Sequence, residues 1–204
     1  METEKLNQVI SPFLIEGTVS KISPLGNGLI NDTYKIETKE DNFPDYVLQR
    51  VNNEVFTDVD LLQHNIEVVT NHIREKLQKQ GESELDRKVL RFIPTKEGKT
   101  YFKDSDGKYW RISVFIPDAK TYELVDAAHS YDAGKAFGHF QSMLTDVPEQ
   151  LGETIPNFHN MELRMNQLRE AVEANPVGRV AEVQDMLDEL ETHANEMCKA
   201  EQLY

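Results

Sequence analysis

The spacing of apolar residues changes along the chain, and this change predicts which segments are helices and which are strands. Apolar residues three and four positions apart predict a short first helix, which Gly17 ends; they are Leu6, Val9, Ile10, Phe13 and Leu14. Three short runs rich in β-formers follow, at 18–22, 33–38 and 46–51, and turn-forming residues separate them. We expect these three runs to form an antiparallel meander.

A long helix is predicted after the third run. Its apolar stripe repeats every three or four residues, and Gly81 closes it; the stripe is Leu62, Ile66, Val69, Ile73 and Leu77. Two or three further strands are predicted near 88–93, 99–102 and 109–116, and a turn at 104–107 joins the last pair. The predicted sheet therefore has about five strands, with the helix inserted after the third.

The pattern becomes helical beyond Pro117 and Asp118. Apolar residues at helical spacing fill three segments, 133–144, 161–172 and 183–197. This shift predicts two domains, 1–116 and 117–204, and an α+β fold in which a sheet-rich lobe precedes a helical one. We expect one apolar helix face to lie partly uncovered and to favour self-association; it consists of Val183, Leu187, Leu190 and Met197.

Charge narrows the classes of ligand. The 204 residues include 36 acidic and 22 basic side chains, which gives a formal net charge of −14. Such a chain repels nucleic-acid phosphates and anionic membranes, so we expect neither as a partner. An anionic ligand would need local backbone donors and a metal ion. The sequence has no apolar run that reads as a signal peptide or a membrane span, and it has one cysteine, Cys198; we expect a cytoplasmic protein.

Six stretches of sequence carry a family resemblance. They are Leu-Gly-Asn-Gly-Leu-Ile-Asn-Asp-Thr-Tyr at 25–34, Tyr-Val-Leu-Gln-Arg-Val-Asn at 46–52, Val-Phe at 55–56, Asn-Ile-Glu at 65–67, Trp-Arg at 110–111 and Ile-Pro-Asn-Phe-His-Asn at 155–160. Together they resemble the aminoglycoside phosphotransferase superfamily, and within it the N-acetylhexosamine 1-kinase-like sugar kinases. The resemblance implies a kinase-like N-terminal lobe that binds ATP with Mg²⁺, followed by an incomplete helical C-terminal lobe.

The glycine-rich turn is the first part of the predicted nucleotide site. Gly26 and Gly28 allow positive φ and close backbone approach, so amides between two strands could hold phosphate oxygens. A plain β-turn would explain the glycines alone. The residues that follow, Asn31-Asp32-Thr33-Tyr34, favour phosphate binding. We predict contacts from Gly26, Asn27, Gly28, Asn31 and Thr33.

The third run departs from the kinase pattern. The resemblance implies a lysine there, held by a glutamate of the next helix, but Gln49 occupies that position. Alternation along a strand turns Val47 and Gln49 toward the nucleotide, whereas Arg50 points away unless a one-residue bulge re-aims it. We predict all three as nucleotide contacts, with Gln49 or Arg50 replacing the lysine. Glu67 either orients one of these side chains or is a solvated helix glutamate.

The end of the fifth predicted strand forms the other part of the site. In the kinase pattern this strand ends at a hinge whose backbone groups receive adenine. Recognition there depends on backbone geometry more than on particular side chains. We name Phe115 and Ile116, just before Pro117, as the predicted contacts.

The chain lacks the motif that would perform phosphoryl transfer. The superfamily uses His-x-Asp-x-x-x-x-Asn, whereas none of the six histidines is followed two positions later by aspartate. We therefore predict no catalytic residue, no metal-binding residue and no activity for this chain alone. The predicted function is the ATP-binding portion of an amino-sugar phosphotransferase, with the sugar bound by the full-length protein. The alternative is a non-catalytic nucleotide-binding or interaction module with a kinase-like fold.

Overall fold

The structure is a computed structural model that describes residues 2–26, 28–122 and 124–199. The chain divides into two compact units, Met1–Thr154 and Ile155–Tyr204. The first unit contains the sheet and the helices packed on it, and the second contains the last two long helices. The boundary predicted after residue 116 separates two functional lobes, whereas the boundary after Thr154 separates two compact units. The functional boundary stays a prediction.

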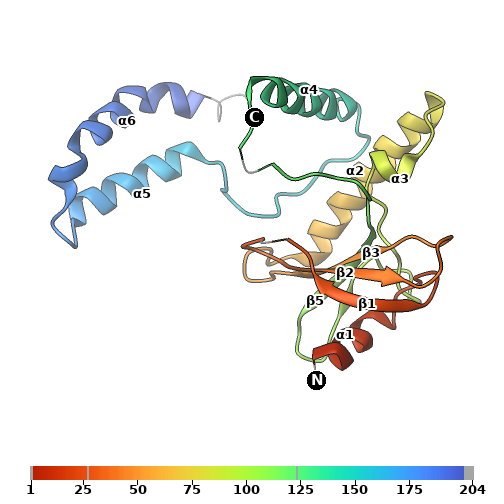
Figure 1. The fold of residues 1–204 in the computed structure, drawn as a ribbon. Coiled ribbons are helices and arrows are strands. Elements are labelled where there is room, and N and C mark those ends of the chain that lie inside the picture. Colours follow the sequence, from red (N-terminus) through yellow and green to blue (C-terminus); the bar gives the residue numbers. More distant parts are fainter. Residues whose placement is uncertain (1, 27, 123, 200–204) are drawn as a thin grey trace. The chain divides into compact units, whose positions relative to one another are not determined.

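The first unit is built on an antiparallel sheet of five strands in the order β1-β2-β3-β5-β4 (Figure 1). The strands are β1 (Val19–Pro24), β2 (Asp32–Thr38), β3 (Tyr46–Val51), β4 (Phe102–Lys103) and β5 (Tyr109–Val114). The long helix α2 (Val59–Lys79) follows the third strand along the chain. An α+β fold with a five-stranded antiparallel sheet and a long helix after the third strand is therefore confirmed.

The main core lies between one face of the sheet and helix α1 (Glu2–Ile10). Ile36, Leu48 and Ile112, one from each of three neighbouring strands, are completely buried on this face. Val9 and Ile10 of α1 pack in the same cluster, as does Phe13 just beyond the helix. Alternation along each strand therefore commits one face of the sheet to this core and leaves the other face to different side chains.

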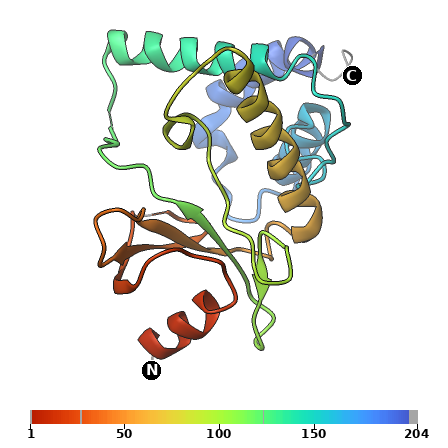
Figure 2. The same cartoon turned by 90° about the vertical axis from the view of Figure 1, so that its right-hand side faces the viewer.

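Helix α2 lies on the opposite side of the sheet from α1 (Figures 1 and 2). Its start is capped by Asp58, whose carboxylate accepts a hydrogen bond of 2.8 Å from the Leu61 amide. Its end is marked by Gly81 at a φ of +76°, a conformation that glycine adopts without strain. The apolar stripe and Gly81 are the signals that locate α2 in the sequence, and the Asp58 cap adds to them.

The strand predicted near 88–93 is wrong. Residues Leu85–Lys88 form one helical turn, α3, and only Phe92 makes a β-bridge, with Ser113. Two short segments instead pair with the outer edge of β5. Phe92 pairs near its end, at Ser113, and β4 pairs near its start, at Tyr109 and Trp110. Both segments use the same edge and each is short. Of the strand predicted at 99–102, only Phe102 belongs to β4.

Helix α4 (Ala127–Met143) and the loop after it are tied to α2 by polar contacts. His72 Nε2 lies 3.1 Å from the Met143 carbonyl oxygen, and Lys76 Nζ donates to the same carbonyl at 2.8 Å. Asn65 exchanges two hydrogen bonds with the backbone of Gly152, at 2.7 and 3.0 Å. Most of α4 nevertheless remains exposed, including Phe137.

The second unit contains α5 (Met161–Ala174), the 3₁₀ turn η1 (Val180–Val183) and α6 (Gln184–Met197). Arg169 of α5 makes a two-pronged salt bridge to Glu191 of α6, with both N–O distances 2.8 Å. On the face predicted to be uncovered, Val183 and Leu190 are exposed while Leu187 and Met197 are half-buried. No helix within the described ranges has the length and apolar character to cross a membrane.

Replacing Leu48 by alanine is expected to destabilise the first unit by about 2–5 kcal/mol, because it empties a completely buried position beneath α1. Urea denaturation followed by circular dichroism measures the change. The matched control is Leu124→Ala, at a side chain that is 91% exposed, which should change stability by no more than about 0.5 kcal/mol. Equal effects of the two substitutions would contradict the assignment of the core face.

Candidate functional site

A row of three polar side chains crosses three neighbouring strands on the sheet face opposite to α1. Strand register places Thr33 of β2 beside Gln49 of β3, and Gln49 beside Arg111 of β5. Gln49 Nε2 donates to Thr33 Oγ1 at 3.2 Å. Arg111 Nε and Nη2 both donate to Gln49 Oε1, at 3.0 and 2.6 Å. We call Thr33, Gln49 and Arg111 the polar row.

The hydrogen bonds of the polar row have a fixed direction. A guanidinium can only donate, so the Gln49 carbonyl oxygen must face Arg111 and the Gln49 amide nitrogen must face Thr33. The Thr33 hydroxyl accepts the bond from Gln49, so its own hydrogen remains free to be donated onward. The row therefore begins with a cation and ends with a hydroxyl donor.

Among the described residues, Arg111 is a partly buried cation without an anionic partner. Its Nη1 is fully enclosed and has no hydrogen-bond partner, and its guanidinium carbon lies 5.4 Å from the centre of the Phe92 ring. Burial lowers the pKa of Arg111 to about 10, since the charged form loses hydration. Within the described ranges no carboxylate forms an ion pair with Arg111, whereas Arg74 and Arg91 both pair with Asp86.

The hairpin between β1 and β2 stands at the Thr33 end of the polar row. Gly26 has a φ of +74°, and a side chain placed there would meet no atom within 4 Å, so the backbone on this side is open. The Leu25 amide donates to the Thr33 carbonyl at 2.8 Å, which closes the hairpin. Gly28 is also part of this turn, while the predicted contact Asn27 lies outside the described residues.

Asn31 ties the hairpin to the end of β3. Its side-chain oxygen accepts a hydrogen bond of 2.8 Å from the backbone amide of Asn52. The neighbouring strands β2 and β3 are thereby joined at the hairpin end by a side chain as well as by their ladder. The predicted contact Asn31 thus holds the turn in place, and its role toward a ligand stays a prediction.

Two of the predicted residues lie apart from the polar row. Arg50 is on the opposite sheet face, because β3 pairs without a bulge, and its Nε donates to Asp32 Oδ2 at 2.6 Å. The Glu67 carboxylate accepts a hydrogen bond from the Thr100 hydroxyl. In the described part of the chain, no hydrogen bond or ion pair joins Glu67 to Gln49 or Arg50.

The predicted hinge follows β5 directly. The Phe115 amide donates to the Asp45 carbonyl at 2.9 Å, and the Lys35 ammonium lies 4.6 Å from the centre of the Phe115 ring. Arg87 donates to the Pro117 carbonyl at 3.1 Å. Val47 lies on the same sheet face as the polar row, and Ile116 is half-buried. The hinge segment is therefore attached to the β2–β3 turn and to α3.

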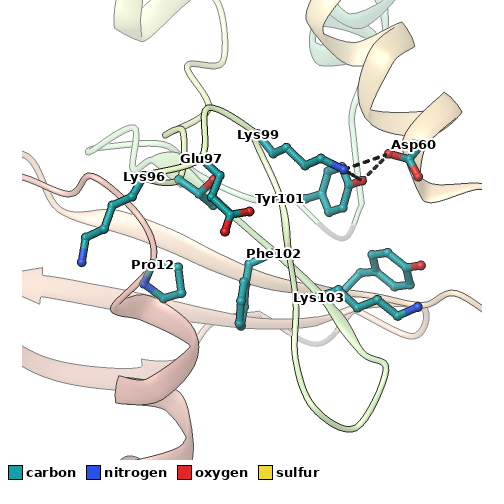
Figure 3. Close-up of a pocket in the computed structure, with 10 residues that line it drawn as sticks. Pro12, Asp60, Lys96, Glu97, Lys99, Tyr101, Phe102 and Lys103 are labelled. Atoms are coloured by element: carbon teal, nitrogen blue, oxygen red, sulfur yellow. Dashed lines mark hydrogen bonds and ion pairs between the residues drawn. The ribbon is translucent and has the colours of Figure 1, made fainter.

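Two cavities lie near this part of the first unit. One, of about 790 Å³, has Phe115 and Pro117 in its wall; it also contains five carboxylates against three cations, which makes it unsuited to a triphosphate. The other, of about 550 Å³, lies beside β4 and contains none of the predicted site residues (Figure 3). There the ammonium of Lys99 already contacts Asp60 and the Tyr101 hydroxyl.

Arg111 is the member of the polar row to which sequence reasoning gave no role. It appeared only in the Trp-Arg pair of the family resemblance. Alternation within β5 is visible in the sequence, but the neighbour of Gln49 follows only from strand register. Within the described ranges no group of three or more histidine, cysteine, aspartate or glutamate side chains is placed to hold a metal ion.

No protein-family model matches the sequence. The connectivity of the sheet and the geometry of the polar row therefore carry the functional argument.

The Lys35–Asp45 pair beside the hinge predicts an acid dependence of stability. Burial raises the pKa of Asp45, but hydrogen bonds from Lys35 and the Thr38 amide outweigh it, so the net pKa is lowered. A carboxyl whose pKa is lower when folded stabilises the protein above its unfolded pKa of about 4, and this stabilisation is lost as pH falls through the folded pKa.

Asp45→Asn is therefore expected to reduce stability by about 1 kcal/mol at pH 7 and to have little effect near pH 2. Urea denaturation across this pH range measures the difference. Asp41→Asn, at an exposed position in the same turn, serves as the control. A loss of stability by Asp45→Asn that is the same at pH 2 and pH 7 would contradict the prediction.

Proposed function

We propose that this chain is the nucleotide-binding portion of a small-molecule phosphotransferase, related to the aminoglycoside phosphotransferase superfamily and acting on an amino sugar of the N-acetylhexosamine kind. The observation that carries the proposal is the connectivity of the first unit. A glycine hairpin joins the first two strands, a long helix follows the third, and the sheet order is β1-β2-β3-β5-β4. This is the element order of the smaller kinase lobe, which the sequence resemblance also implies.

The polar row supports placing the phosphates beneath the hairpin. In a chain with a net charge of −14, a phosphate group needs a local concentration of donors. The open backbone at Gly26 and the hydroxyl of Thr33 lie at one end of the row, and both can supply donors. Mg²⁺ would enter with the nucleotide, where it would neutralise part of the phosphate charge.

The proposed role stops at binding. Phosphoryl transfer needs a carboxylate that orients the attacking hydroxyl and further groups that hold Mg²⁺ against the phosphates. The sequence contains no histidine with an aspartate two positions later, and the described residues contain no metal-holding group. We therefore assign the sugar site and the catalytic groups to the full-length protein.

Gly26→Ala is expected to weaken Mg·ATP binding by roughly tenfold, because an alanine at a φ of +74° costs about 1–2 kcal/mol and the hairpin amides would shift to relieve it. Isothermal titration calorimetry measures the affinity, and amide chemical shifts at Gly26, Gly28 and Asn31 locate the ligand. Binding by the unaltered chain should itself be weak, since Gln49 stands where the kinase pattern has a lysine.

Gly107→Ala is the matched control, because Gly107 has the same φ of +74° in the hairpin between β4 and β5. Both substitutions should lower the free energy of unfolding by similar amounts, but only Gly26→Ala should weaken ATP binding. If millimolar Mg·ATP leaves the hairpin amide shifts of the unaltered chain unchanged, the proposed function is wrong.

The chain alone is expected to transfer no phosphate to N-acetylglucosamine above background. Loss of groups that position and stabilise the transferred phosphoryl typically lowers rates by orders of magnitude. A coupled assay for ADP release in the presence of ATP, Mg²⁺ and the sugar tests this, with the sugar omitted as the blank. Sugar-dependent turnover would mean that catalytic groups lie in this chain and that the proposed division of roles is incorrect.

A further inference from the structure

A phosphate site of the proposed kind needs a positive charge, and the third strand does not provide one. Gln49 is neutral, and Arg50 lies on the other sheet face, where its guanidinium is bound to Asp32. Lys35 lies on the same sheet face as the polar row, but its ammonium is 2.9 Å from Asp45. Of the cations that strand register places on this face, Arg111 in the next strand is the one that hydrogen-bonds to Gln49 among the described residues.

From this geometry we infer that Arg111 takes the place of the third-strand lysine and supplies positive charge to a nucleotide phosphate through Gln49 and Thr33. The inference rests on the proposed nucleotide function. Arg111 acts here as a positioning residue, since its nitrogen atoms contact Gln49 while the Thr33 hydroxyl is the group free to meet the ligand. The ligand class is a polyphosphate, alone or as part of a nucleotide.

The first argument is energetic. A cation that loses hydration without gaining an anion destabilises the folded chain, and proteins ordinarily pair such groups. The sequence has 36 acidic side chains, and within the described part of the chain none of them forms an ion pair with Arg111. Other arginines of the same unit do pair with carboxylates. A bound phosphate would compensate the charge of Arg111, so the folded chain is less favourable without the phosphate than with it.

The second argument concerns direction. Each group of the polar row donates toward the hairpin, from Arg111 to Gln49 and from Gln49 to Thr33. Hydrogen bonds arranged head to tail polarise one another, so a charge at one end strengthens the donor at the other. Gln49 is suited to this role because its amide both accepts and donates, whereas a lysine could not accept a bond from Arg111.

Gln49→Glu tests the inference by giving Arg111 the anion that it lacks. The substitution keeps the shape of the side chain and forms an ion pair with a partly buried guanidinium, so thermal stability should rise. Because the charge of Arg111 is then neutralised, the affinity for inorganic tripolyphosphate should fall at least about tenfold. If the polar row only stabilised the fold, a rise in thermal stability would not be accompanied by a fall in tripolyphosphate affinity.

Arg111→Met provides the complementary test, because methionine keeps apolar bulk and removes the charge. Stability should be unchanged or higher, whereas tripolyphosphate affinity should fall about tenfold or more and adenosine affinity should stay within about twofold. Arg74→Met is the control, since Arg74 of α2 is paired with Asp86 of α3; it should lower stability and leave both affinities unchanged. Arg111→Lys, which keeps the charge, should retain part of the tripolyphosphate affinity.

The outcomes separate the inference from the function on which it rests. If the unaltered chain binds ATP and the Arg111→Met and Gln49→Glu variants bind tripolyphosphate equally well, the role of Arg111 is overturned and nucleotide binding stands. If the unaltered chain binds neither ATP, tripolyphosphate nor adenosine, the proposed function fails and the inference fails with it. If both variants lose stability, the role of Arg111 is to stabilise the fold and the inference is rejected.

Discussion

The register of β3 against its two neighbours is the constraint on which the rest of the structure depends. In this register Leu48 lies beside Ile112 and faces the core under α1, while the next residue, Gln49, lies beside Thr33 and Arg111 on the other face. A slip of one residue would exchange the two faces. It would expose the core side chains and at the same time break the polar row. Burial of Leu48 therefore also fixes the candidate site.

Two arginines on opposite faces of the sheet differ in how their charge is balanced. On the α1 face near the hairpin, Arg50 near the end of β3 pairs with Asp32 at the start of β2, so the charge of Arg50 is already balanced. On the other face Arg111 is held by a neutral amide and is only partly hydrated. Acidic residues are plentiful in the chain, so their overall number does not explain why Arg111 lacks a carboxylate partner among the described residues. The cause lies in the immediate surroundings of Arg111.

The sequence predicted those features that depend on local signals. The bounds of β3 at Tyr46–Val51 and the placement of α2 agree with the structure, because strand alternation, the helical stripe and Gly81 are all read from neighbouring residues. The failure at 88–93 has a non-local cause, since two segments share one edge of β5. Arg111 was missed for a similar reason: its partner Gln49 is 62 residues away, and only the register brings them together.

Strand β5 sets the distance between the two parts of the candidate site, the polar row and the hinge. Arg111 and Phe115 are four residues apart on or just after one strand, which corresponds to roughly 13 Å along an extended chain. Between them the face carries Ser113 and, across the ladder, Val47, and both side chains are small. An elongated ligand with a polyanionic end at the polar row and an aromatic end at Phe115 would thus meet no large side chain from β3 or β5 between its two ends. Since the cavity at Phe115 is rich in carboxylates and the polar row is not, the polyanionic end of such a ligand has one favourable orientation.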